Sequence, residues 1–327
     1  MRRRAFIAGL AAASCLVVPA RAQNGKIYRL GFLSATSFAA NSGPGRLADG
    51  ILGRLARDGF PRRGSLALEK RGAETRLERL PALVSELAAS KVDVIVAAGY
   101  PAAAEKQGAP GIPIVAVNTG DPVETGLVRS LGRPGGNLTG ISDVATELAP
   151  KRLEILKDVA PGLRRVAMLW TADDLGMELR YDASAAAARK LGVAVRSFGM
   201  REPRDFDRAF AATERALPDG LLVVAGMTTT LNRGRVYDFA NAHRLPAIYE
   251  TAAFARDGGL LSYGPDGAEL VGRAASLVER ILQGTSPAAL PLEQPTRFRL
   301  VVNLKTAKAI GLEIPRDILA RADEVIE

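Results

Sequence analysis

The chain has 327 residues, with a single cysteine, Cys15, and a formal net charge of +9 from 44 basic and 35 acidic residues. The bases are spread along the chain rather than gathered in runs, so we expect a solvated surface and no nucleic-acid partner. One thiol excludes an internal disulfide and a thiolate metal site. The length exceeds that of one ordinary core and predicts two lobes.

The first 22 residues have the pattern of a signal peptide. Three arginines precede an apolar run from Ala5 to Val18, and Ala20-Arg21-Ala22 fits a small-x-small cleavage site. The run is shorter than the ~20 residues that a transmembrane helix needs. We therefore expect cleavage after Ala22 and a soluble protein exported to the periplasm.

Two details of the export signal leave alternatives open. Arg3-Arg4-Ala5-Phe6-Ile7 resembles a twin-arginine signal, so either the Sec or the twin-arginine route would fit. Cys15 is a candidate lipoprotein anchor, but the preceding Ala12-Ala13-Ser14 matches a lipobox poorly, and we favour cleavage without an anchor. The four arginines before residue 23 leave with the peptide, so the mature net charge is +5.

Strand and helix patterns alternate along the rest of the chain. Buried-strand runs are separated by segments with apolar residues at helical spacing, the pattern of βα units in a parallel sheet. Two such series predict an α/β fold with two doubly wound parallel-sheet lobes. The predicted strands are residues 26–33, 66–68, 92–99, 113–118, 164–170, 193–198, 219–226, 245–250, 260–264 and 298–303.

The last part of the chain is too short for a third lobe. One strand and an apolar helix follow the second series, and a final strand and two short helices follow the proline-rich stretch 291–296. We expect the chain to return to the first lobe and cross again, forming a three-crossover hinge. The predicted ranges are 23–136 and 259–290 for lobe 1, and 137–258 and 291–327 for lobe 2.

Ligands of open parallel sheets bind beyond the carboxyl ends of the strands, so the candidate site residues are taken from those ends. They are Ser34 and Thr36; Gly99, Tyr100 and Pro101; Thr119 and Asp121; Trp170, Thr171 and Asp173; Gly226, Met227 and Thr228; and Tyr249 and Glu250.

The residue types at these ends suit an amino acid. Hydroxyls at helix N-termini, such as those of Ser34, Thr36 and Thr228, can hold a carboxylate together with backbone N–H groups. The carboxylates of Asp121, Asp173 and Glu250 can neutralise an ammonium group. The aromatic rings fit an apolar ligand face or, equally, plug the sheet edge.

The sequence gives little support for catalysis. The only histidine, His243, ends a predicted helix, and no nucleophile elbow or zinc motif is present, so we expect no enzyme, cofactor or metal. The stretch Gly43–Ala48 fits a dinucleotide pattern but lies too far after its strand. An exported α/β enzyme that uses Asp121 or Glu250 as acid or base remains an alternative.

Three stretches carry a family resemblance. Residues 120–142 (GDPVETGLVRSLGRPGGNLTGIS), LLSYGPD at residue 260 and the ending from Gln294 resemble the substrate-binding proteins of ABC transporters in the TrpX-like family. The resemblance runs from about Tyr28 to the end of the chain. It implies a type I periplasmic binding fold whose lobes close on a small molecule and then dock on an ABC permease, with the protein a monomer.

The resemblance also suggests ligand contacts. It implies carboxylate binding near Ser34, Thr36 and residues 99–101, and polar contacts at the later strand ends. Members with known ligands bind aromatic amino acids. A periplasmic sensor without transport is the alternative within the same binding class, whereas a transcription-factor core is not expected because the signal peptide occupies the place of a DNA-binding head.

The glycine-rich stretch RPGGNLTG, Arg133 to Gly140, is interpreted as the first hinge segment. It lacks the strand and the GK[ST] ending of a phosphate-binding loop. Asn137, which also fits a glycosylation pattern, is a secondary ligand candidate.

Overall fold

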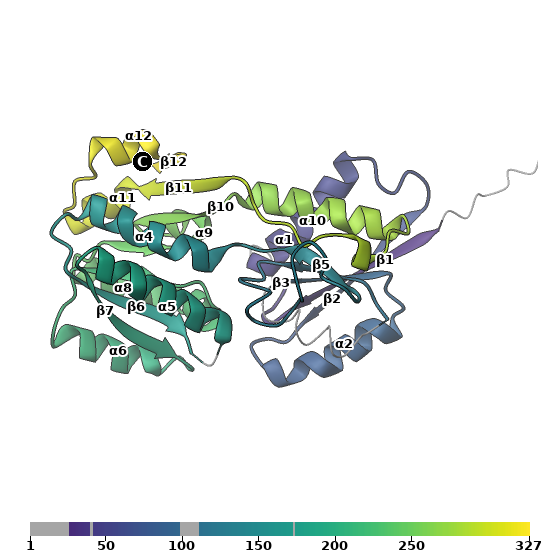
Figure 1. The fold of residues 1–327 in the computed structure, drawn as a ribbon, viewed down its shortest axis with the longest axis horizontal. Coiled ribbons are helices and arrows are strands. Elements are labelled where there is room, and N and C mark those ends of the chain that lie inside the picture. Colours follow the sequence, from purple (N-terminus) through teal and green to yellow (C-terminus); the bar gives the residue numbers. More distant parts are fainter. Residues whose placement is uncertain (1–25, 40–41, 99–110, 173) are drawn as a thin grey trace, which may run out of the picture.

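The structure is a computed structural model that describes residues 26–39, 42–98, 111–172 and 174–327. The predicted signal peptide and the site candidates Gly99, Tyr100, Pro101 and Asp173 lie outside these residues. Two α/β lobes lie side by side, joined where the chain passes between them (Figure 1). The predicted fold class is confirmed.

The first lobe is built on a five-stranded parallel sheet in the order β2-β1-β3-β4-β5. Alternate residues of β1 face opposite helix layers: Leu30 and Phe32 pack on α1 and α10, and Leu33 packs on α2. The elements are β1 (Ile27–Ser34), α1 (Gly43–Arg57), β2 (Ser65–Gly72), α2 (Leu80–Ala89), β3 (Val94–Ala98), β4 (Ile114–Val117), β5 (Leu138–Ile141) and α10 (Gly267–Leu282), with short 3₁₀ turns at Leu77–Arg79 and Pro287–Ala289.

The start of α1 explains the apparent dinucleotide motif. Ser42 Oγ accepts a hydrogen bond from the N–H of Gly45 at 3.0 Å, and Pro44 stands in the first turn. A serine N-cap followed by proline is an ordinary helix start. The glycines therefore belong to a helix cap, as the spacing from the first strand predicts.

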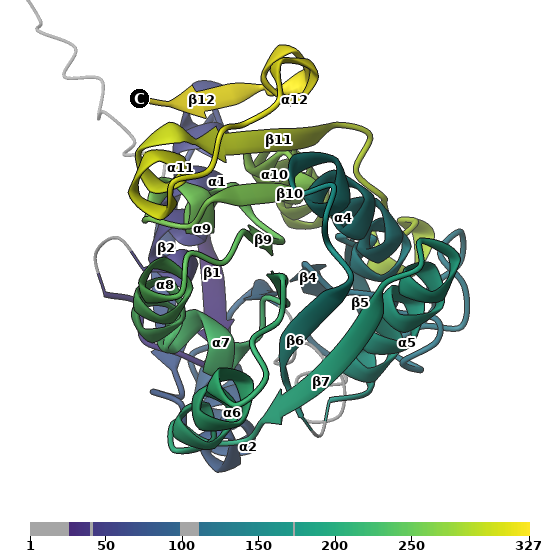
Figure 2. The same ribbon diagram turned by 90° about the vertical axis from the view of Figure 1, so that its left-hand side faces the viewer.

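The second lobe has a seven-stranded sheet in the order β12-β11-β10-β9-β8-β6-β7, parallel except for the antiparallel pair β10–β11. Figure 2 shows α4 and α5 on one face of this sheet and α6 and α8 on the other. The strands are β6 (Arg165–Thr171), β7 (Ala194–Met200), β8 (Gly220–Val223), β9 (Ala247–Tyr249), β10 (Leu261–Pro265), β11 (Phe298–Asn303) and β12 (Glu324–Ile326). The helices are α4 (Ala145–Val159), α5 (Leu175–Lys190), α6 (Asp205–Glu214), α7 (Met227–Leu231), α8 (Arg233–Ala242), α9 (Ala252–Arg256), α11 (Leu304–Ile310) and α12 (Arg316–Arg321).

Three segments cross between the lobes, as expected, but two strands lie in the other lobe from the one predicted. Leu138–Ile141 pairs with β4 of the first lobe, and Leu261–Pro265 pairs with β9 of the second. The crossovers are therefore Ser142–Val144, Asp266 and Glu293–Arg297. A short apolar strand has the same local pattern in either sheet, and only its pairing partner decides where it lies.

The crossover correction changes the interpretation of RPGGNLTG. Gly135 and Gly136 have φ angles of 73° and 67°, which form the turn before β5. The segment thus leads into a strand of the first lobe, and the chain crosses only after Ser142. Within the described residues no helix is both long enough and apolar enough to span a membrane.

Candidate functional site

The two lobes approach each other at the carboxyl ends of their strands. A Cβ built on Gly120, in the loop after β4, would lie 3.3 Å from Arg180 Nη2 on α5. A Cβ built on Gly176, also on α5, would lie 3.7 Å from Thr125 Cγ2. The loop after β4 and the first two turns of α5 are therefore in contact across the two lobes.

Small hydroxyl groups line the end of β1. Ser34 is 3% exposed, and its Oγ accepts a hydrogen bond from the Thr36 N–H at 3.0 Å. The two hydroxyl oxygens are 3.3 Å apart. The pair presents two hydroxyls at one strand end, but not at a helix N-terminus as the sequence analysis expects, because α1 begins only at Gly43.

Several buried polar atoms at this edge lack a hydrogen-bond partner. Such an atom ordinarily costs about 1–3 kcal/mol, so a group of them marks a place where a ligand or water completes the bonding. In the described part of the chain they come from both lobes and from the first crossover: Thr119 Oγ1, Asp143 Oδ1, Thr146 Oγ1, Thr171 Oγ1 and Arg180 Nε. Ser262 Oγ, within β10, is a further one.

A buried cluster of four charged side chains lies behind these atoms. Glu250 Oε1 accepts from Arg152 Nη1 at 2.7 Å, and Glu250 Oε2 accepts from Arg180 Nη1 at 2.8 Å. Oε2 also accepts from the Ala225 N–H at 2.9 Å. Arg180 Nη2 lies 3.5 Å from Asp143 Oδ2, so the cluster reaches the first crossover.

Arg152 connects the cluster to the chain just after the first crossover and just before the second. Its Nε donates to the carbonyl of Tyr263 at 2.8 Å, and its Nη1 donates to the carbonyl of Ala145 at 3.1 Å. Burial lowers the pKa of Arg152; for Arg180, burial also acts downward, but the carboxylates of Glu250 and Asp143 outweigh it and raise the pKa. Both guanidinium groups remain charged.

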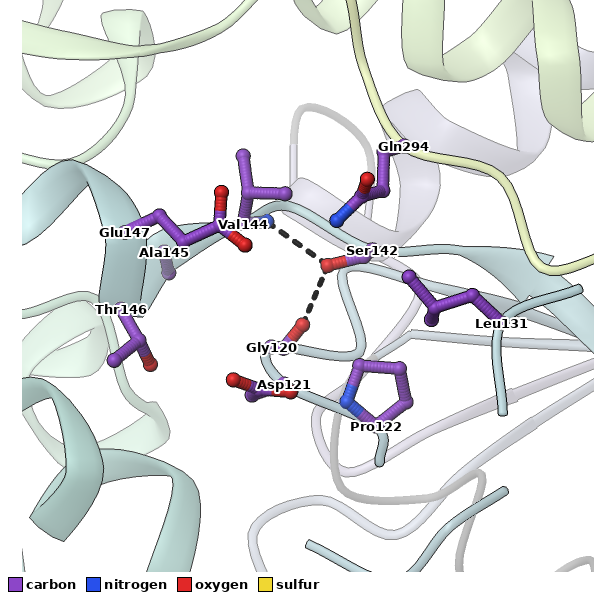
Figure 3. A pocket seen from close by; sticks show the side chains of 10 residues that line it. All are labelled: Gly120, Asp121, Pro122, Leu131, Ser142, Val144, Ala145, Thr146, Glu147 and Gln294. Carbon is purple, nitrogen blue, oxygen red and sulfur yellow. Dashed lines mark hydrogen bonds between the residues drawn. The ribbon is translucent and has the colours of Figure 1, made fainter. Parts of the chain in front are cut away.

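A small cavity lies at the crossovers themselves (Figure 3). Its volume is about 60 Å³, room for a few water molecules rather than an aromatic amino acid. Ser142 Oγ beside it donates to the Gly120 carbonyl at 2.5 Å and accepts from the Val144 N–H at 2.9 Å. The lining residues are Gly120, Asp121, Pro122, Leu131, Ser142, Val144, Ala145, Thr146, Glu147 and Gln294.

The model of a known family, described as ABC transporter substrate binding protein, matches residues 38–326. The chain belongs to this family. The resemblance found in the sequence is thereby confirmed, and the protein is a substrate-binding protein.

Known proteins agree with this assignment. A tyrosine-binding protein of Clostridioides difficile is 24% identical over 270 residues, which are 81% of this chain and 76% of that protein. The crystal structure of an ABC domain in complex with L-Trp from Streptococcus pneumoniae has a TM-score of 0.81 at 23% identity, covering 91% of this chain and all of that one. A conserved domain protein from Vibrio cholerae gives 0.84 at 22% identity, covering 92% of this chain and all of that one.

The substrate-binding protein uses Glu250 differently from the prediction. Both carboxylate oxygens already accept hydrogen bonds from arginines, and the side chain is 4% exposed. This carboxylate therefore neutralises two arginines of its own protein. The predicted ligand contact of Glu250, and the alternative of an enzyme acting through it, therefore have no support in this geometry.

Two predicted aromatic contacts also point elsewhere. Tyr249 is 1% exposed and stacks on Phe254 with ring centroids 5.2 Å apart, inside the core beneath α8 and α9. Trp170 stacks on Tyr181 of α5 at 5.8 Å and donates from Nε1 to Ser197 Oγ. Successive side chains of a strand alternate between faces, so a residue at a strand end can still face a helix layer.

Asn137 lies at the wrong edge for a ligand contact. It precedes β5, so it stands at the amino ends of the parallel strands. Its Nδ2 donates to the carbonyl of Ile112 at 2.7 Å, just before β4. This bond supports the turn that leads into β5.

The remaining predicted residues stay at the carboxyl edge. Gly226 is the N-cap of α7, which starts at Met227 and includes the buried Thr228. A Cβ built on Gly226 would come within 2.9 Å of the Thr171 Cβ and closer to its hydroxyl. Only glycine lets the end of β6 and the start of α7 approach this closely.

Sequence reasoning missed Asp143, Arg152 and Arg180. The two arginines are buried on α4 and α5. From sequence, a basic side chain in a helix is expected on the solvated face, so the pattern does not identify these two. Asp143 directly follows a strand end, the same signal that identified Asp121, but the strand was assigned to the other lobe. The described residues hold no cluster of three or more metal-ligating side chains.

Proposed function

We propose that this protein is the periplasmic receptor of an ABC importer, which captures an aromatic amino acid between its lobes and delivers it to a membrane permease. The relatives support the ligand class, since one is named for binding tyrosine and another was crystallised with L-Trp. The signal-peptide pattern of residues 1–22 supports the location.

The observation that carries this proposal is the group of buried, unpartnered polar atoms on both sides of the lobe contact. Thr119 belongs to the first lobe and Thr171 to the second. A small molecule that bonds to both would hold the lobes together. We propose the hydroxyls of Ser34 and Thr36 as the partners of its carboxylate.

Binding would then be coupled to lobe closure. A ligand that contacts both lobes has a higher affinity for the closed arrangement, and this difference shifts the population toward it. The permease would recognise the closed form. No covalent chemistry is needed for this role.

Thermal melting of the mature protein with and without ligand tests the proposal. We expect L-tyrosine, L-tryptophan or L-phenylalanine to raise Tm, because a ligand that binds only the folded state stabilises it. At 100 times Kd the gain is about 2.7 kcal/mol, which is a shift of roughly 5 °C for a chain of this size.

The screen should include glucose and a branched-chain amino acid as comparison ligands. A shift with sugars alone, or no shift with any amino acid, would contradict the amino-acid assignment. The family membership would stand in either case, because it rests on the sequence match.

A further inference from the structure

We propose that Asp143 is the counter-ion for the ammonium group of the bound amino acid. The proposal rests on the function proposed above and names a residue of that same site. It follows from which oxygen atoms of the nearby carboxylates are already occupied.

The position of Asp143 is fixed by its neighbours on the first crossover. Ser142 is fastened to the loop after β4 through the Gly120 carbonyl, and Val144 has a φ of 44° with its N–H bound to Ser142 Oγ. A β-branched residue in this conformation is strained and persists only where its surroundings impose it. Asp143 therefore stands at a defined point between the two lobes.

Only one of the two oxygens of Asp143 is in use. Oδ2 lies 3.5 Å from Arg180 Nη2, whereas Oδ1 is buried and has no hydrogen-bond partner. An ionised carboxylate can accept about four hydrogen bonds. A buried carboxylate oxygen without a donor is costly, and an ammonium group supplies up to three donors and the opposite charge.

The charge balance of the cluster favours the same residue. Glu250 is bonded to both Arg152 and Arg180, and Asp143 is the second carboxylate facing the two guanidinium groups. The charges of the two carboxylates and the two guanidinium groups cancel. A bound amino acid zwitterion adds no net charge to this region. Thr119 Oγ1, also unpartnered, is a second acceptor on the first-lobe side.

Two of the other described acids at this edge are less suitable, and a third, Asp121, is the alternative that the test below includes. Glu250 has no free oxygen, and Asp174 caps α5 by accepting from the Met177 N–H at 3.3 Å. Asp121 lines the small cavity at the crossovers, on the side shared with Thr146 and Glu147 (Figure 3).

The test compares ligands with and without an ammonium group by calorimetric titration. Wild-type protein should bind L-tyrosine at least roughly 30-fold more tightly than 3-(4-hydroxyphenyl)propionate, which lacks only that group. Asp143→Asn should lose roughly 30-fold or more in affinity for L-tyrosine, while its affinity for the propionate stays within about 3-fold. L-tryptophan and indole-3-propionate form a second pair.

Asp49→Asn is the matched control, because Asp49 is an exposed residue of α1 whose side chain is 72% accessible. It should bind both ligands as the wild type does. Melting of each ligand-free variant checks that it is folded. If Asp143→Asn is not, equal binding of the paired ligands by the wild type still overturns the proposal, and a loss in Asp121→Asn does so too.

The outcomes separate the two proposals. Equal wild-type affinity for L-tyrosine and the propionate, or an Asp143→Asn variant with wild-type affinity for L-tyrosine, would overturn the role of Asp143 and leave the aromatic ligand in place. A loss confined to Asp121→Asn would transfer the ammonium to that residue. A wild-type protein that binds neither tyrosine nor tryptophan would overturn the proposed function itself.

Discussion

Individual side chains at the site are held by partners that are distant in the sequence. Glu250 is 98 residues from Arg152 and 70 residues from Arg180, yet it binds both. Removing one member of a buried ion pair leaves an uncompensated charge, which is far more destabilising than an exposed pair is stabilising. The buried cluster of Glu250, Arg152, Arg180 and Asp143 thus supports the strand ends at which we propose that the ligand binds.

Because Gly226 and Thr171 lie so close together, we expect a single methyl group added at Gly226 to lower the stability of the protein. Gly226→Ala would press the new Cβ against the side chain of Thr171, whose Cβ is 2.9 Å away and whose hydroxyl is nearer. We expect a loss of stability of about 1–3 kcal/mol from overpacking, with weaker ligand binding because Thr171 is displaced. Urea unfolding and titration with L-tyrosine measure the two effects.

Gly234→Ala is the control for this substitution. Gly234 lies in α8, and a Cβ built there has no neighbour within 4 Å. It should be neutral or slightly stabilising, since alanine favours a helix. Equal stability of the two alanine variants would mean that α7 moves away from β6 at little cost.

At the scale of elements, the second and third crossovers are fastened to each other. Glu269, near the start of α10, accepts from the N–H of Arg297 at 2.8 Å and from the hydroxyl of Thr296 at 2.7 Å. Arg273 joins the same carboxylate to Glu293. The first crossover joins them, because the N–H of Ser142 donates to the carbonyl of Glu293 at 2.9 Å. Hydrogen bonds therefore link all three crossovers.

The carboxylate of Glu269 gives the protein an acid-dependent component of stability. Burial alone would raise the pKa of Glu269, but hydrogen bonds from Thr296, Arg297 and Arg273 outweigh it and lower the pKa from 4.5 to about 2. A lowered folded-state pKa contributes stability above the unfolded value of 4.5, and this contribution disappears as the pH falls toward 2. Glu269→Gln should therefore lower Tm at pH 6 and have a smaller effect at pH 3.

Melting curves of the wild type and of Glu269→Gln across this pH range provide the measurement. Glu313→Gln, at an exposed position in the loop after α11, is the comparison variant. A Tm difference between the wild type and Glu269→Gln that stays constant from pH 6 to pH 3 would rule out the ionised carboxylate as its source.

A helix or strand can be predicted from the sequence where the local pattern of apolar residues determines it. Its place in one lobe or the other cannot be predicted where only pairing with a distant strand determines it. The alternation of apolar strands and helices predicts the two lobes and most element positions. It does not show to which lobe β5 and β10 belong, because a run such as Leu138–Ile141 is apolar enough for either sheet. The sequence does not predict β12, since Glu324–Ile326 is too short to have a pattern.

The site was predictable in place but not in orientation. Ser34, Thr36 and Thr171 lie at the strand ends where parallel-sheet topology puts them. Tyr249 and Glu250 occupy a strand end too. The side-chain alternation along the strand directs Tyr249 into the core, and two arginines that are distant in the sequence bind Glu250. Such pairings leave no trace in the spacing of residues along one chain.

On the scale of the whole molecule, the hydrophobic cores of the described residues stay separate. Each cluster of buried apolar residues draws its members from one lobe only. The lobes meet instead through the crossovers and where the loop after β4 lies close to α5, at Gly120 and Arg180 and at Thr125 and Gly176. The lobe opening proposed above would therefore break few contacts.

A disulfide across this contact should hold the lobes closed. A Cβ at Gly176 would be 3.7 Å from Thr125 Cγ2, so cysteines at these two positions would be direct neighbours, and a small shift of the loop would bring their sulfurs to the ~2.05 Å of a disulfide. Because Cys15 is the only natural cysteine and lies before the predicted cleavage site, the mature Thr125→Cys, Gly176→Cys variant has just these two thiols. We expect oxidation, faster with L-tyrosine present, to slow ligand exchange strongly.

Thiol titration and stopped-flow ligand exchange follow the two steps, and reduction should restore the wild-type rate. Each single cysteine variant serves as a control for the substitution alone. Exchange at the wild-type rate in the fully oxidised protein would argue against lobe opening as the route of entry.

The separation between strand ends and crossovers has a consequence for how this scaffold can diversify. The hinge is held largely by main-chain bonds and by the charged cluster, whereas Thr119 Oγ1 and Thr171 Oγ1, the proposed ligand contacts at the strand ends, make no hydrogen bond within the described residues. Under the proposed function, we therefore expect substitutions at Thr119 or Thr171 to alter the preferred ligand and to leave the proposed closing motion intact. Single substitutions of this kind would change the ligand specificity while the residues of the hinge stay the same.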